Sequence, residues 1–156
     1  MIARQIASEV YAISLGFVNV FLLNVAELTL IDTGVPGSAA RIIKAILEIG
    51  RQPEDLRHIL VTHLHMDHTG SLAELKRISG AQTYMHPLDA EVYSQGKVMR
   101  PVEPSPGWIT RIIVKRVNAG KRKKNPDIAM INQFLAGGED LDSTGGIQAI
   151  HAPGHT

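Results

Sequence analysis

The apolar residues of this chain fall into two kinds of run, short continuous ones and longer ones with helical spacing. The short runs predict buried strands, at residues 10–15, 17–25, 28–31, 59–62 and 81–85. Apolar positions three and four residues apart predict helices, at residues 38–49, 69–78 and 87–94. Because strands alternate with helices, the pattern predicts a layered α/β domain.

The last third of the chain departs from this alternation in two places. Residues 96–125 carry nine lysines and arginines against one acidic residue, Glu103, with three prolines near the start. We interpret this stretch as a variable basic excursion from the core, with a helix at 108–117 followed by an exposed loop. Residues 128–151 hold short apolar runs broken by two glycine pairs, a pattern that predicts β-hairpins.

The composition narrows the class of protein. With 156 residues, of which 44% are hydrophobic, residues 1–156 are predicted to form a single domain with enough apolar material for a core. A net charge of +1 gives no argument for a polyanionic partner, and the absence of cysteine excludes disulfides and thiolate metal sites. The apolar stretch at 13–25 is too short and too polar to span a membrane, and Glu9 before it argues against a secretory signal. We therefore expect a cytoplasmic protein with no membrane association.

Four side chains that can bind a metal ion follow the predicted strand at 59–62. His63 and His65 lie two apart, and such residues point the same way on an extended backbone, so they can bind one ion from the same side. Asp67 and His68 come where the loop turns into a helix, and they can face a second ion nearby. Asp67 is also a fair N-cap candidate, which is its structural alternative. A single histidine is more often a surface or core residue, but three histidines and one aspartate within six positions favour a metal site.

A further imidazole comes from the other end of the chain. His155 follows Pro153 and Gly154, a turn pair that can bring a distant strand end back to the cluster. Neutral imidazole is a good ligand for zinc and other first-row metals, and a catalytic zinc typically has about three protein ligands with one position left for water. His63, His65 and His155 would supply that set.

These motifs resemble those of the metallo-β-lactamase superfamily. Residues 63–68 match its HxHxDH signature, residues 30–34 match the strand end that precedes it, and residues 153–156 match the segment that carries the next histidine. The matches occur in the family's order and span nearly all of the chain. The resemblance implies a four-layer αββα sandwich with the metal ions at one edge of its two sheets.

The resemblance also implies which side chains hold the metal. It assigns two sets of ligands: His63, His65 and His155 to a first ion, and Asp67 and His68 to a second. Asp67 would in addition orient the nucleophile in catalysis, and Asp32 would accept a hydrogen bond from a ligand and fix its orientation. The expected cofactor is zinc, as one or two ions, with iron or manganese as alternatives.

The chain departs from the family's pattern at its C-terminus. In the family, an aspartate that bridges both metals and a further histidine follow the Pro-Gly-His-Thr segment, whereas this sequence ends at Thr156. We therefore expect a truncated chain in which the second half of the sandwich is incomplete. We also expect one weakly bound metal at the three-histidine site and a second site that is empty or poorly held.

The function that the resemblance implies is that of a metal-dependent hydrolase, which uses a metal-activated hydroxide on a small ester, thioester or lactone. One alternative is a phosphodiesterase or nuclease of the same fold, which the basic residues between 111 and 124 would favour by neutralising phosphates. We prefer to interpret that run as a solvated loop, so a small molecule is the expected partner and nucleic acid the less favoured one. The other alternative is a non-catalytic metal-binding half-domain, whose exposed apolar face would lead to self-association as a homo-oligomer.

The remaining histidines and aromatic residues carry weaker signals. His58 opens a strand and is predicted to lie at the surface, and His86 is predicted to be structural. His151 lies four residues before His155, where it either supports a metal ligand or simply ends a strand. We expect three aromatic side chains in the core rather than along a substrate cleft: Tyr84, Tyr93 and Trp108.

Overall fold

The structure is a computed structural model, and it describes residues 2–97, 111–112 and 127–155. The predicted basic excursion at 96–125 therefore lies almost entirely outside the described residues, as does Trp108. Within the described ranges, the element order follows the predicted alternation of strands and helices. No helix in these ranges is long and apolar enough to cross a membrane.

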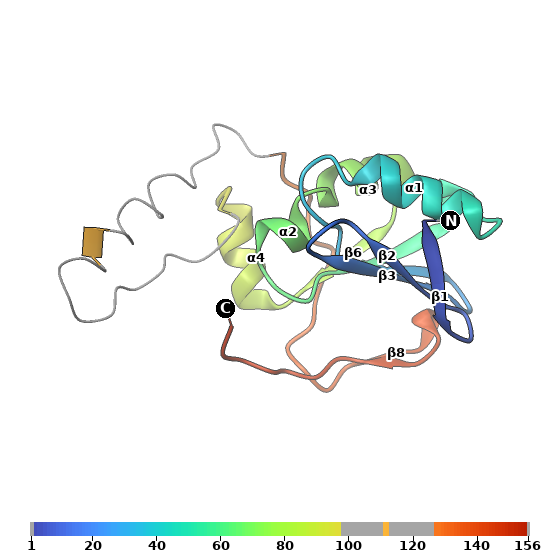
Figure 1. Ribbon diagram of the computed structural model, residues 1–156. Helices are drawn as coiled ribbons and strands as arrows, with labels where there is room; N and C mark the ends of the chain where they lie inside the picture. Colours follow the sequence, from blue (N-terminus) through green and yellow to red (C-terminus); the bar gives the residue numbers. More distant parts are fainter. Residues whose placement is uncertain (1, 98–110, 113–126, 156) are drawn as a thin grey trace.

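A seven-stranded mixed sheet forms the centre of the structure (Figure 1). Its strands are hydrogen-bonded in chain order: β1 (Ala3–Ala7), β2 (Val10–Ser14), β3 (Asn19–Asn24), β4 (Leu28–Ile31), β5 (Leu56–Leu60), β6 (Gln82–Met85) and β7 (Gln133–Phe134). Tight turns join β1 to β4, so these strands are antiparallel, whereas longer crossovers join β4 to β7, so these strands are parallel. The apolar pattern predicts β2 to β6, although β5 begins three residues earlier than expected, and it misses β1 and β7.

Two helices cover one face of this sheet, on its upper side in Figure 1: α1 (Ala39–Glu48) and α3 (Leu72–Ser79). α1 buries Ile42 and Ile46, which lie one turn apart on the face that the helical spacing predicts. Two further helices, α2 (Met66–Thr69) and α4 (Pro87–Ser94), follow β5 and β6, and a 3₁₀ turn, η1 (Pro53–Asp55), precedes β5. The bounds of α4 are those that the sequence predicts.

The helix predicted at 69–78 corresponds to α3, which begins only at Leu72, and Thr69 instead ends the separate short helix α2. Gly70 separates α2 from α3, because its N–H donates to the carbonyl oxygen of Gly34 at 2.8 Å and so leaves the helical hydrogen-bond pattern. The backbone approach is close: a Cβ at Gly70 would lie 2.4 Å from Cδ of Pro36. This contact joins the loop after β4, which carries Asp32, to the segment after β5, which carries four of the five predicted metal ligands.

The opposite face of the sheet carries the C-terminal segment, drawn in orange and red below the sheet in Figure 1. β8 (Asp140–Leu141) and β9 (Ile147–Gln148) pair as an antiparallel hairpin around a second 3₁₀ turn, η2 (Asp142–Thr144). The hairpin prediction is therefore confirmed for β8 and β9, whereas β7 instead extends the main sheet as a parallel strand. The helix layer, the large sheet and this small second sheet agree with the expected αββα architecture.

One buried histidine shows that the prediction for His58 was wrong. His58 was expected at the surface, but it is only 5% exposed, because it lies on β5 between its two neighbours β4 and β6. Its Nδ1 lies 2.9 Å from the hydroxyl of Tyr84, and its Nε2 lies 2.6 Å from a carboxylate oxygen of Glu27. Tyr84 and Tyr93 are buried, as predicted.

The parallel strands determine where the polar loops meet. β4, β5 and β6 run in the same direction, so their carboxyl ends lie at one edge of the sheet. The connections that leave this edge begin at Asp32, Val61 and His86. The predicted ligands His63 to His68 therefore lie between one loop that carries Asp32 and the first turn of α4.

Candidate metal centre

Three imidazoles meet at this edge of the sheet. His63 and His65 lie in the connection after β5, and His155 comes from the C-terminal segment. One ligand nitrogen from each residue lies within 4.8 Å of the others. The ring centroid of His155 is 4.8 Å from that of His63 and 4.7 Å from that of His65. The fold thus brings together the two distant pieces of sequence, as a shared metal ion would require.

The donor set fits a divalent cation. Nε2 of His63 lies 3.1 Å from Nδ1 of His65, so two ring nitrogens face each other across the position between them. Burial, together with the neighbouring imidazoles of His68 and His65, lowers the pKa of His63. A lowered pKa favours the neutral imidazole, which is the form that binds a metal. Three such ligands match a zinc site that keeps one position for water.

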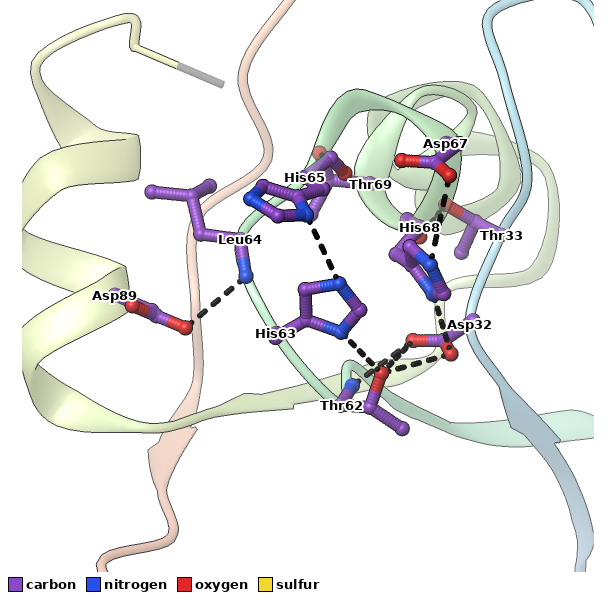
Figure 2. Close-up of polar contacts among 10 residues, drawn as sticks. All are labelled: Asp32, Thr33, Thr62, His63, Leu64, His65, Asp67, His68, Thr69 and Asp89. Atoms are coloured by element: carbon purple, nitrogen blue, oxygen red, sulfur yellow. Dashed lines mark hydrogen bonds and ion pairs between the residues drawn. The ribbon is translucent and has the colours of Figure 1, made fainter. Parts of the chain in front are cut away.

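Residues 61–70 carry four of the predicted metal ligands, and we call them the ligand loop. Asp32 holds the beginning of this loop (Figure 2). The residue is buried and has a φ of 63°, a left-handed conformation that aspartate adopts more readily than most residues. Its carboxylate accepts hydrogen bonds from the N–H of Thr62 at 2.9 Å and from the hydroxyl of Thr62 at 2.9 and 3.0 Å. The same carboxylate lies 2.8 Å from Nδ1 of His68. One buried side chain therefore contacts both ends of the loop.

Asp67 and His68, on α2, lie beside the three-histidine cluster. Asp32 occupies Nδ1 of His68, so Nε2 is the ring atom left for a metal, and it lies 3.7 Å from Oδ2 of Asp67. The ring centroids of His68 and His63 are 4.0 Å apart. The hydrogen bond to Asp32 raises the pKa of His68. Asp67 lies in the first turn of α2 and is not its N-cap, a position that His65 takes.

Several polar residues of the site are absent from the sequence-based prediction. Thr33 donates from its N–H and its hydroxyl to the carbonyl oxygen of His68, both at 2.8 Å. The hydroxyl of Thr62 lies 3.0 Å from Nδ1 of His63. Both threonines adjoin the motif residues, and that position is a signal that could have found them. Asp89, a buried residue of α4, has no comparable signal in the sequence.

A cavity of about 530 Å³ opens beside the histidines, between the main sheet and the C-terminal segment. Apolar side chains make up much of its lining: Ile31, Leu60, Leu88, Leu135, Ile147 and Ile150. His63 and His155 also line it, so a molecule bound there would touch the three-histidine cluster. The rings of His86 and His151 stack on its wall with centroids 4.7 Å apart, and His86 also caps α4 by accepting the N–H of Leu88 at 3.3 Å.

Comparison with known proteins assigns the chain to a family. The family model described as the metallo-beta-lactamase superfamily matches residues 13–156. An uncharacterized protein of Bacillus subtilis, YobT, is 34% identical over 139 residues, which cover 83% of this chain and 49% of that protein. A hydroxyacylglutathione hydrolase of Albidiferax ferrireducens is 45% identical over 49 residues, which cover 31% of this chain and 18% of that protein.

Solved structures show the same fold. A metallo-β-lactamase of Cronobacter sakazakii with a HARLDQ motif is similar with a TM-score of 0.77 at 25% sequence identity, covering 99% of this chain and 56% of that one. The chain spans about half the length of YobT and of the Cronobacter structure.

Proposed function

Since the chain belongs to the metallo-β-lactamase superfamily, we propose that it carries the metal centre of a hydrolase that acts on a small ester, thioester or lactone. The observation that carries this proposal is the convergence of His63, His65 and His155, whose ligand nitrogens lie within 4.8 Å of one another. The cavity beside them would hold the substrate.

Zinc is the proposed cofactor, and iron or manganese would suit the same ligands. A bound divalent metal would supply hydroxide at neutral pH, because it lowers the pKa of its water to about 7. His63, His65 and His155 would hold this ion. Asp32 would keep Nε2 of His68 available for a second ion, and Asp67 would share that ion and orient the attacking water.

The lining of the cavity supports an acyl substrate. Ile31 and Leu60 from the sheet, and Ile147 from β9, would contact an apolar acyl chain. His63 and His155 on the same wall would bring the bond to be cleaved to the metal centre. A relative whose name describes the hydrolysis of an acylated compound supports the same class of reaction. The basic residues from 115 to 124, which would favour a phosphodiester substrate, lie outside the described residues, so that alternative stays a prediction.

Metal binding by the 156-residue chain is the first test. Calorimetry with Zn²⁺ at about pH 7.5, where most imidazoles are neutral, should show binding. His65→Ala and His155→Ala should each weaken it by about 100-fold or more, because each removes one of three ligands. His86→Asn is the matched control, because it removes an imidazole from the cavity wall and keeps a side chain that can cap α4. Equal affinity of all four chains would contradict the proposal.

Hydrolysis separates the substrate classes. Relative to the uncatalysed reaction of each compound, the metal-loaded chain should accelerate the release of p-nitrophenol more from p-nitrophenyl acetate than from bis(p-nitrophenyl) phosphate. His65→Ala should abolish the release, and His86→Asn should retain metal-dependent turnover. A preference for the phosphodiester would replace the acyl substrate with the nuclease-type alternative.

A further inference from the structure

The first turn of α4 lies against the ligand loop, and the topology of the sheet is the reason. β5 and β6 are parallel neighbours, so the loop that leaves β5 and the helix that follows β6 begin side by side. Asp89 is the acidic residue in this first turn. A helix N-terminus favours a negative charge, so the carboxylate is stabilised at this position even though it is only 3% exposed.

Asp89 makes a defined contact with the middle of the ligand loop. Its Oδ2 accepts a hydrogen bond from the N–H of Leu64 at 3.0 Å (Figure 2). Leu64 lies between the two ligands His63 and His65, and its side chain is fully buried. A bond to this one N–H therefore acts on the backbone that carries two of the three imidazoles.

The contact complements the one made by Asp32. Asp32, after β4, accepts the N–H of Thr62, and Asp89, after β6, accepts the N–H of Leu64. Two buried carboxylates thus hold the backbone on either side of His63. Each follows one of the two strands that flank β5. Hydrogen bonds to ionised acceptors are stronger than those to neutral ones, so both contacts restrict the loop effectively.

The two contacts act at neighbouring points of the backbone, before His63 and between His63 and His65. A side-chain oxygen at residue 89 is what the second contact needs, because it accepts the N–H that lies between the two imidazole-bearing residues. We propose that Asp89 is a positioning residue of the metal centre, which fixes the imidazoles of His63 and His65 through Leu64. The inference rests on the proposed function, because it assumes a metal at the three histidines.

The test compares the Zn²⁺ affinity and the Co²⁺ spectrum of variants of Asp89. Asp89→Ala removes the acceptor and should weaken Zn²⁺ binding by about 10- to 100-fold, as loss of a partner that orients a ligand typically does. Asp89→Asn keeps an oxygen that can accept the N–H and should restore most of the affinity. The visible spectrum of the Co²⁺-loaded chain, which reports ligand geometry, should change in Asp89→Ala and resemble the unmodified chain in Asp89→Asn.

A second acid on the same helix supplies the control. Glu91 is exposed on α4, so Glu91→Ala and Glu91→Gln remove the same charge without touching the loop. Neither should change the Zn²⁺ affinity or the Co²⁺ spectrum. If Asp89→Ala does not fold, Asp89→Ser takes its place, because a serine hydroxyl suits the first turn of a helix but is too short to take over the contact with Leu64.

The outcomes separate this inference from the proposed function. Unchanged Zn²⁺ affinity in folded Asp89→Ala or Asp89→Ser overturns the positioning role, and so does an Asp89→Asn chain that loses as much affinity as the alanine chain. If His65→Ala and His155→Ala still weaken binding in those cases, the metal centre stands and only the role of Asp89 fails. If they do not weaken it, the proposed function itself fails.

Discussion

The two segments that supply the three histidines differ in how firmly the rest of the molecule holds them. Two buried carboxylates, Asp32 and Asp89, accept backbone N–H groups of the ligand loop, residues 61–70. The third-ligand segment, residues 150–155, is exposed throughout. Within the described part of the chain, the last backbone hydrogen bond before it is donated by Ala149, at 2.8 Å.

For the proposed metal centre, this difference would separate two histidines that are in place before the metal binds from a third that the metal would have to hold. A loop that is already ordered loses little conformational freedom on binding, whereas an exposed segment loses more. We therefore expect His63 and His65 to form a preorganised pair, with His155 as the member whose position depends most on the ion. Metal binding would then stabilise the C-terminal segment, because an ion that binds only the folded arrangement shifts the equilibrium toward it.

The largest effect that we expect comes from removing the carboxylate that holds the loop. Asp32→Ala should lower the free energy of unfolding of the metal-free chain by about 2 kcal/mol or more, because Thr62 loses its acceptor and alanine is strained at a φ of 63°. Chemical denaturation with urea measures this change. Asp32→Asn should cost clearly less, since asparagine tolerates the left-handed conformation and retains one acceptor oxygen.

The same pair of variants tests whether the ligand loop is held more firmly than residues 150–155. If the loop is the preorganised region, Asp32→Ala should also weaken Zn²⁺ binding, while Asp32→Asn recovers part of the affinity. A chain with Asp32→Ala that is as stable as the unmodified chain, and that binds Zn²⁺ equally well, would show that the loop needs no such support.

A smaller effect should follow from disturbing the third-ligand segment without altering any ligand. Gly137 has a φ of +112°, and a Cβ there would lie 2.7 Å from Cβ of His151 and 2.9 Å from its backbone nitrogen. Gly137→Ala should therefore displace the backbone that leads to His155 and weaken Zn²⁺ binding about 10-fold. This is the lower end of the loss in metal affinity that follows when a residue supporting a ligand is removed. Calorimetric titration with Zn²⁺ measures the difference.

Gly138 is the matched control for that substitution. It also has a positive φ, +100°, but a Cβ there would meet nothing within 4 Å. Gly138→Ala therefore shares the backbone strain of Gly137→Ala but not the collision with His151. Equal losses of Zn²⁺ affinity in the two chains would mean that strain alone explains the effect, and the segment would then have no specific role in placing His155.

The ligand loop was predictable from the sequence because its signal is local. The residues that share the loop, His63 to His68, are neighbours in the chain, and their spacing alone gives the direction of the side chains. The convergence with His155 depends on the path of the chain through β7, β8 and β9, and the first of these strands was not predicted. The turn at Pro153 and Gly154 allowed the two pieces to meet, and the resemblance to a family implied that they do.

The residues that support the loop were harder to predict, because burial is a property of the whole sheet. Asp89 falls on a short helix that was predicted with its observed bounds, yet nothing in its spacing indicates that its carboxylate faces the loop. His58 was misplaced for a related reason. The strand predicted at 59–62 begins at Leu56 in the structure, so His58 lies inside β5 between β4 and β6 and is buried.

The smallest effect concerns a hydrogen bond between a side chain of β5 and one of β6, His58 and Tyr84. Burial raises the pKa of Tyr84, whose hydroxyl lies 2.9 Å from Nδ1 of His58. Tyr84→Phe removes this hydrogen bond and should lower the free energy of unfolding by about 1 kcal/mol.

The carbonyl of Tyr84 still accepts the N–H of Val61 at 2.9 Å, so the start of the ligand loop keeps its backbone contact. The Zn²⁺ affinity of Tyr84→Phe should therefore stay within about a factor of two of that of the unmodified chain. A tenfold change would correspond to about 1.4 kcal/mol of binding free energy. A large loss of affinity would mean that the whole strand, and not the carboxylates at its end, holds the metal ligands in place.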